Sequence, residues 1–193
     1  MLKLLSEIRS CKVCSKHLPL EPRPIVAGTK NSKIILVSQA PGRKAHDHNK
    51  AWDDPSGRKL REWLGVTDEQ FYDPDNFAVL PMGFCFPGKA KTGDLPPRKE
   101  CAPLWHDLFW KELKDVKLIL VIGKYAQDRY LKELSKRNLT ENVGSYHEFL
   151  PKFFPLPHPS PVNRFWMSKN PWFESDVVPE LKNLVSSILN TTT

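Results

Sequence analysis

The chain has 193 residues, of which 40% are apolar, and its 29 basic and 22 acidic side chains leave a formal net charge of +7. This composition excludes an intrinsically disordered chain, and the length predicts a single domain over residues 1–193. No apolar run reaches the ~18 residues of a membrane span or forms a secretory signal, so we expect a cytoplasmic protein with no membrane partner and, from its charge, a polyanionic ligand.

Predicted strands and helices alternate along the chain. Apolar runs bounded by turn residues predict buried strands, and apolar residues at helical spacing predict amphipathic helices. In chain order, these patterns predict a helix at residues 1–9, a strand at 33–38, a helix at 55–64, a strand at 76–80, a helix at 98–113, a strand at 117–123, a helix at 125–134, a strand at 152–156 and a helix at 179–189. The alternation predicts an α/β fold, a three-layer αβα sandwich with a central, mainly parallel sheet of about four strands.

Long loops follow three of the predicted strands, at Gln39–Asp54, Pro81–Pro97 and His158–Arg164. The chain contains 18 prolines, well above the usual share of about 5%, so long segments must be irregular. Ligands of open parallel sheets bind at the C-terminal ends of the strands. We therefore expect the three loops to build one site.

The chain has four cysteines, Cys11, Cys14, Cys85 and Cys101. The first two form a C-x2-C, a spacing that lets two thiolates turn toward one metal centre. The cytosol disfavours disulfides, so the four thiols are candidate ligands of a structural zinc ion or of an iron–sulfur cluster, and spacing does not choose between them. The alternative is four unrelated buried cysteines.

The first loop opens with the sequence Ser38-Gln39-Ala40-Pro41-Gly42. Gln39 can present its amide to a ligand, and backbone N–H groups near Gly42 can approach a ligand closely. An ordinary turn is the alternative for this motif.

The third loop opens with His158-Pro159-Ser160-Pro161. Two prolines fix the backbone beside the histidine, and Ser160 can cap a short helix that has Pro161 at its first position. Such a helix start exposes backbone donors to a phosphate. The alternative is a rigid loop with a bystander histidine.

Trp52 lies among polar residues and is a candidate stacking platform for a base, or a core aromatic that anchors the next helix. Asp53 and Asp54 can cap that helix or position a water molecule. Basic residues in and beside the loops are candidate phosphate contacts, with a solvated face as the alternative: Lys89, Lys91, Arg98 and Arg164.

Together these motifs resemble those of the uracil-DNA glycosylase superfamily, and the iron–sulfur class called family 4 is the nearest. The resemblance spans residues 11–172. It rests on the C-x2-C near the start, on Ser38–Gly42 against the family's Gly-Glu-Ala-Pro-Gly, on Ala51-Trp52 against its Pro-Phe pair, on two later cysteines around a Pro/Arg-rich loop, and on the His-Pro motif at His158.

Three positions depart from the family pattern. Pro81 stands where the family has its uracil-reading Asn, and Gln39 stands where the iron–sulfur class has Glu. Ala40 stands where other uracil enzymes place a water-activating Asp. The usual carboxylate bases are therefore missing from the first loop.

The resemblance implies a base-excision glycosylase that acts on uracil or another deaminated base in DNA, either single-stranded or uracil-containing, as a monomer. It favours a [4Fe-4S] cluster over zinc on the four cysteines. It implies that His158 stabilises negative charge on the departing base and that Asp53 or Asp54 positions water. Residues that would contact the base or substrate are Gln39, Ala40, Pro41, Gly42, Trp52 and Ser160.

A second hypothesis is a non-catalytic or differently reacting binder of nucleic acid or nucleotides on the same fold. Pro81 and the missing carboxylates favour it, whereas His158 and the cysteines favour the glycosylase.

Overall fold

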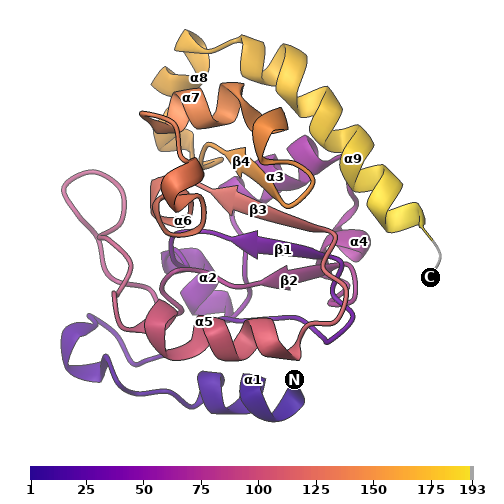
Figure 1. The fold of residues 1–193 in the computed structure, drawn as a ribbon. Coiled ribbons are helices and arrows are strands. Elements are labelled where there is room, and N and C mark those ends of the chain that lie inside the picture. The colour runs from indigo at the N-terminus through magenta and orange to yellow at the C-terminus, as the bar shows by residue number, and fades with distance from the viewer. Residues whose placement is uncertain (192–193) are drawn as a thin grey trace.

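Four strands form one parallel sheet at the centre of the computed structural model, which describes residues 1–191. They are β1 (Ile34–Val37), β2 (Phe77–Val79), β3 (Leu118–Ile122) and β4 (Phe153–Leu156), in the order β2-β1-β3-β4. All three pairings are parallel, so the predicted α/β fold with a parallel sheet of four strands is confirmed (Figure 1).

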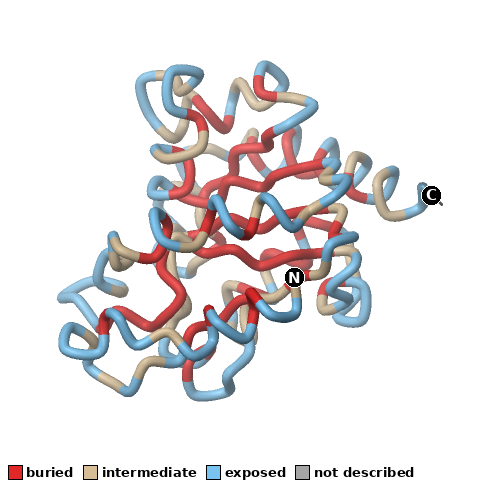
Figure 2. The backbone as a smooth tube through the Cα atoms, turned by 60° about the horizontal axis from the view of Figure 1, so that its bottom comes forward, coloured by how far each residue is buried: buried red, intermediate tan, exposed pale blue. Residues whose placement is uncertain are grey.

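Every residue of the four strands is buried because helices cover both faces of the sheet (Figure 2). Alternate side chains of a strand point to opposite faces. Ile34 and Leu36 pack into one core cluster, whereas Ile35 and Val37 pack into the other. The continuous apolar strands of the sequence therefore fill two cores.

The core on one face is closed by four helices and a π-helical turn: α3 (Pro55–Leu64), α4 (Asp68–Tyr72), α7 (Leu139–Gly144), the turn Phe173–Val177 and α9 (Val178–Asn190). The core on the other face is closed by α1 (Leu2–Arg9), α5 (Cys101–Glu112) and α6 (Lys124–Tyr130). Two further short helices are α2 (Arg43–His48) and α8 (Arg164–Lys169).

The helices differ from the predictions at several points, and α4, α7 and α8 were not predicted at all. The segment Gln39–Asp54 contains α2 and is not a continuous loop. Helix α5 begins at Cys101 instead of residue 98. The helix predicted at residues 125–134 divides into α6 and a 3-10 turn at Lys132–Leu134. Within residues 1–191, no helix is long and apolar enough to cross a membrane.

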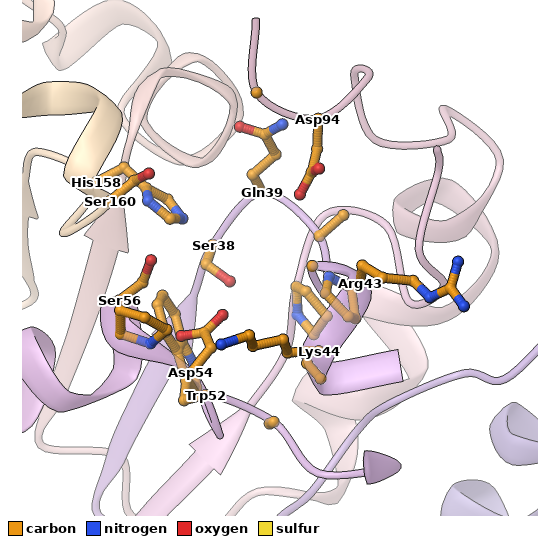
Figure 3. A pocket seen from close by; sticks show the side chains of 18 of the residues that line it. Ser38, Gln39, Arg43, Lys44, Trp52, Asp54, Ser56, Asp94, His158 and Ser160 are labelled. Carbon is orange, nitrogen blue, oxygen red and sulfur yellow. The ribbon is translucent and has the colours of Figure 1, made fainter. Parts of the chain in front are cut away.

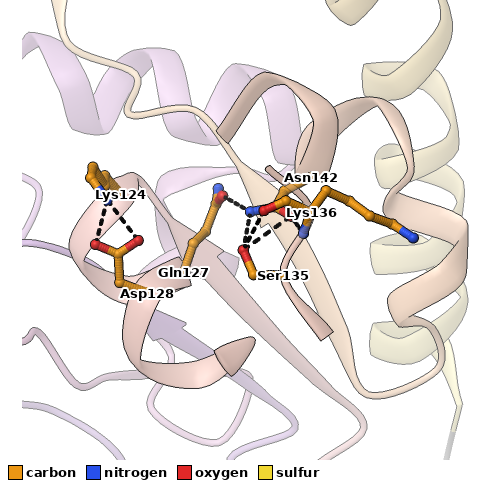
Figure 4. A network of polar contacts seen from close by, with 6 residues as sticks. All are labelled: Lys124, Gln127, Asp128, Ser135, Lys136 and Asn142. Carbon is orange, nitrogen blue, oxygen red and sulfur yellow. Dashed lines mark hydrogen bonds and ion pairs between the residues drawn. The ribbon is translucent and has the colours of Figure 1, made fainter. Parts of the chain in front are cut away.

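A buried polar network holds the end of β4 in place (Figure 4). The Gln127 amide donates to the backbone oxygen of Leu156 at 3.0 Å and accepts from Asn142 Nδ2 at 3.0 Å. Asn142 Oδ1 accepts in turn from the backbone N–H of Lys136 at 2.7 Å. A satisfied network of this kind is rigid, and Leu156 precedes His158 by two positions. The network therefore fixes the strand end that carries the histidine.

Candidate active site

A cavity of about 460 Å³ opens at the C-terminal edge of the sheet, and all three predicted loops line it (Figure 3). The connections from β1 to β2 and from β3 to β4 run to opposite sides of the sheet, so the strand order reverses between β1 and β3. Open parallel sheets bind ligands at such a point. Many of the predicted site residues meet in its wall: Gln39, Ala40, Pro41, Gly42, Trp52, Asp54, Lys89, His158 and Ser160. The expected gathering of the loops at one site is therefore confirmed.

Trp52 and His158 stack on one another in the wall of this cavity. Their ring centroids are 5.7 Å apart and the ring planes differ by 29°. Trp52 is also buried in the core, so it anchors the start of α3 and lines the cavity at once. Both roles proposed for this residue from sequence are compatible with its position.

The backbone of Trp52 is left-handed, with φ of 57°. Such a conformation costs roughly 1–3 kcal/mol in a bulky residue and persists only where the surroundings enforce it. Gly57 of α3 lies so close that an added Cβ would be 1.7 Å from the Trp52 oxygen, and Arg61 Nη1 donates to that oxygen at 3.3 Å. Helix α3 therefore fixes the backbone of Trp52.

The surroundings of His158 favour the neutral form of its imidazole. Burial lowers its pKa below the ordinary 6.5, while the negative charges of Asp54 and Asp94 oppose that effect. Asn163 Nδ2 donates to the backbone oxygen of His158 at 2.7 Å and steadies the loop. A neutral, oriented imidazole can donate a hydrogen bond to an oxygen that gains negative charge.

The structure separates the two neighbouring aspartates that the sequence left as alternatives. Asp54 caps α3, accepting from the backbone N–H of Gly57 at 2.8 Å, and it lines the cavity. Asp53 is absent from the cavity wall and pairs with His48 Nδ1 at 2.7 Å. The hydrogen bond to His48 is the main reason that the pKa of Asp53 is lowered.

Ser160 has the predicted capping role. It precedes a 3-10 turn at Pro161–Asn163, with Pro161 in the first position, and its Oγ accepts from the backbone N–H of Val162 at 3.3 Å. The phosphate-binding role proposed for this turn stays a prediction.

The four basic candidates occupy different surroundings. Lys89 lines the cavity and pairs with Asp94 at 2.7 Å, and Lys91 is exposed. Arg164 is exposed at the start of α8, 5.0 Å above the ring of Phe165. Arg98 instead pairs with Glu100, and its side chain opposes the rise in the pKa of Cys14 that burial causes.

Sequence analysis missed Asp94, which lines the cavity opposite Asp54. Its side chain is 25% exposed. A Cβ added to Gly42 would lie 3.5 Å from Asp94 Oδ2 and 3.7 Å from Asp54 Oδ2, so the two carboxylates border one small space. Ser38, Lys44, Ser56 and Asn163 also line the cavity and were not predicted. The only signal for Asp94 in the sequence was its place after Gly93, five positions from Lys89, in a segment that could form a turn.

The four cysteines are free thiols, and Cys14, Cys85 and Cys101 are buried. Burial raises the pKa of Cys85 to about 12 and that of Cys101 to about 11, and nearby cysteine charges add to both effects. The backbone N–H groups of Arg23 and Phe84 act in the opposite direction and lower the pKa of Cys85 and of Cys101, respectively. Within residues 1–191, no three His, Cys, Asp or Glu side chains gather as they would around a single metal ion.

Comparison with known proteins places the chain in a family. One solved structure that it matches is a solution NMR structure from Methanosarcina acetivorans, described as a "putative Uracil DNA glycosylase", with 12% identity and a TM-score of 0.46 over 83% of this chain and 98% of that chain. The model of the Uracil DNA glycosylase superfamily matches residues 25–182, which include all three loops of the cavity. The chain therefore belongs to the uracil DNA glycosylase superfamily.

Proposed function

We propose that this protein is a DNA glycosylase that hydrolyses the N-glycosidic bond of uracil or another deaminated base. The observation that carries the proposal is the stacked Trp52–His158 pair, which lines one cavity of about 460 Å³ together with Asp54 and Asp94 (Figure 3). A cavity of this size accommodates a base that has been flipped out of the DNA stack. Membership of the superfamily supports DNA as the substrate.

The base would stack near Trp52, with its polar edge toward Gln39. The Gln39 Nε2 donates to the backbone oxygen of Leu95 at 3.3 Å, which leaves the amide oxygen as an acceptor. Uracil, hypoxanthine and xanthine all present a ring N–H beside a carbonyl, and an amide oxygen can accept from that N–H. Pro81 lines the cavity without any donor of its own, so Gln39 takes the recognition role in this proposal.

In the proposed reaction, the bond between C1′ and the base nitrogen breaks and its electron pair leaves with the base. His158 donates a hydrogen bond to the base oxygen on which negative charge grows. The Asp54 carboxylate stabilises the positive charge that develops on the sugar. A water oxygen then bonds to C1′, and the water's proton finally reaches the departed base.

DNA would lie across the mouth of the cavity. Exposed Lys91 and Arg164 supply phosphate contacts there, and such contacts release counterions, so binding should weaken with salt. Val162 and Phe165 are 55% and 67% exposed beside the cavity loop. Apolar side chains in this position can fill the space that a flipped base leaves. We propose that the protein acts as a monomer on single-stranded or uracil-containing DNA.

We propose a [4Fe-4S] cluster on the four cysteines as the resident cofactor, as the resemblance to family 4 implies; structural zinc is the alternative. Four cysteines are the usual ligand set of such clusters, and the charges of Cys11, Cys14 and Cys101 all act on Cys85. When bound, the cluster would cross-link Cys11 and Cys14 to Cys85 and Cys101.

The test is an excision assay on oligonucleotides that carry one uracil, hypoxanthine or xanthine, in single and double strands. Alkali cleaves the strand wherever a base has been removed. We expect cleavage of at least one deaminated substrate and none of the matched normal oligonucleotide. The proposal is wrong if no oligonucleotide in the panel loses its base.

A non-catalytic binder is the second candidate, and Ala40 in place of a carboxylate favours it. That candidate predicts salt-dependent binding of the same oligonucleotides with no excision.

A further inference from the structure

Asp94 reaches the cavity on a short hairpin from the loop between β2 and α5. Lys89 and Asp94 face one another as an antiparallel bridge. The backbone N–H of Ala90 donates to Gly93 at 3.1 Å, and that of Leu95 donates to Gly88 at 2.9 Å. Gly93 turns the chain with φ of 75°. The hairpin is therefore an ordered element that presents Asp94 in a defined position.

The Asp94 carboxylate is held at one oxygen and directed into the cavity at the other. Lys89 Nζ lies 2.7 Å from Oδ1. Oδ2 lies near Gly42, facing Asp54 across the space that the missing Gly42 side chain leaves open. Gln39 ties the hairpin to the end of β1 through the backbone oxygen of Leu95. Oδ2 of Asp94 is therefore held in a position from which it could accept a proton inside the cavity.

Asp94 also supplies what the first loop lacks. Ala40 offers no carboxylate, and Asp54 already spends one oxygen on the cap of α3. The charges of both Asp54 and Asp94 act on His158, so all three side chains share one electrostatic environment. A glycosidase needs a carboxylate that can take a proton from the attacking water.

We propose that Asp94 is a catalytic residue whose Oδ2 accepts the proton of the attacking water, while Lys89 acts as a positioning residue by holding Oδ1. This inference rests on the proposed glycosylase function and deepens it. As the water oxygen bonds to C1′, one proton passes from water to Asp94 and then to the departed base, which restores the carboxylate. Asp54 keeps the electrostatic role toward the sugar.

The test compares Asp94→Asn with the parent and with Asp115→Asn. Asp115 is a matched control because it also pairs with a lysine, Lys117, at the start of β3 on the opposite edge of the sheet. Single-turnover excision is measured on the deaminated oligonucleotide that the parent cleaves, together with the dissociation constant of that oligonucleotide. We expect Asp94→Asn to lower the rate by about 10²-fold or more without weakening binding, since removal of a negative charge favours DNA.

A second variant keeps the inference testable if Asp94→Asn fails to fold. Gly42→Ala places a methyl group between the two carboxylates, at 3.5 Å from Asp94 Oδ2, on a backbone with φ of −75° that alanine adopts readily. We expect this methyl group to exclude the attacking water and to slow excision.

The outcomes separate the two proposals. Suppose that the parent excises a base. If Asp94→Asn then excises at the parental rate, or if its DNA binding weakens by the same factor as its rate, the proposed role of Asp94 is wrong. The proposed glycosylase function is not affected by either result. If Asp94→Asn is unfolded and Gly42→Ala excises at the parental rate, the role is also wrong. If the parent excises nothing, both proposals fall.

Discussion

His106 is a fully buried histidine behind the cavity wall. Its Nε2 donates to the backbone oxygen of Pro81 at 3.1 Å, and its Nδ1 accepts from the Tyr130 hydroxyl at 2.6 Å. The Tyr130 oxygen accepts in turn from Trp110 Nε1 at 3.0 Å. These partners fix the neutral tautomer of His106, which holds Pro81 in the wall of the site.

Burial lowers the pKa of His106 from 6.5 to about 4, so this residue should make stability depend on pH. Between these two values the unfolded chain binds a proton that the folded protein does not. Stability is therefore full above about pH 6.5 and falls as the pH drops toward 4, by up to roughly 3 kcal/mol. His158 and His46 act in the same direction because burial lowers the pKa of each.

The measurement is denaturant unfolding at roughly pH 7 and pH 5 for the parent and for His106→Gln, whose amide can still donate to Pro81. We expect the parent to lose more stability than the variant on acidification. Equal losses would contradict the assignment.

Three residues that line the cavity, His158, Trp52 and Gln39, could be predicted from the sequence. The full set of carboxylates could not. Asp53 and Asp54 are neighbours, and only the start of α3 decides which one faces the cavity. Asp94 meets Gly42 across 52 positions of chain through the folding of a hairpin. Patterns along the sequence do not report such tertiary contacts.

Among the secondary-structure elements, helix α3 is capped by a residue that has two roles. Asp54 caps the helix with one carboxylate oxygen and faces the cavity with the other. Asparagine caps helices about as well as aspartate, whereas alanine does not. The two roles can therefore be separated by substitution.

We expect Asp54→Asn to keep the parental stability, while Asp54→Ala loses about 1 kcal/mol in free energy of unfolding. Both variants should slow excision because both remove the negative charge. Unfolding in denaturant and single-turnover assays measure these two effects. An Asn variant that excises at the parental rate would show that the charge of Asp54 is not used.

The strands were predictable because they are continuous apolar runs. Such short runs are typical of parallel strands that are buried on both faces. Helix α2 was not predictable, since Arg43–His48 is almost entirely polar. Its place is set by the tertiary contacts of Ala45 and His46, which are buried. Helix α5 begins at Cys101, three residues after the predicted start at residue 98, and Arg98 pairs with Glu100 just before it.

In the molecule as a whole, the four cysteines lie on segments that are far apart in sequence. Cys11 and Cys14 follow α1, Cys85 lies in the loop after β2, and Cys101 opens α5. A cofactor shared by these thiols would fasten the N-terminal segment to one face of the sheet. The family match begins at residue 25, so this segment lies outside it.

We expect anaerobically purified protein to be brown and to contain iron and sulfide, and to lose both when Cys85 or Cys101 is changed to Ser. Loss of the cofactor should also lower the unfolding temperature, because binding to the folded state stabilises it. Metal analysis and visible absorbance provide the measurement. One zinc ion per chain without iron would favour the zinc alternative, and protein without either metal would contradict both.

In the proposed function, base removal in the cavity depends on His158, and the single-turnover excision rate of His158→Ala tests this dependence. The matched control is His147→Ala, since His147 is exposed on the 3-10 turn at Tyr146–Phe149. With a deaminated oligonucleotide as substrate, we predict that loss of this donor lowers the rate by about 10²–10³-fold. Binding should change far less, because the hydrogen bond strengthens only as charge grows on the base. Excision by His158→Ala at the parental rate would contradict the proposed role of His158 in base removal.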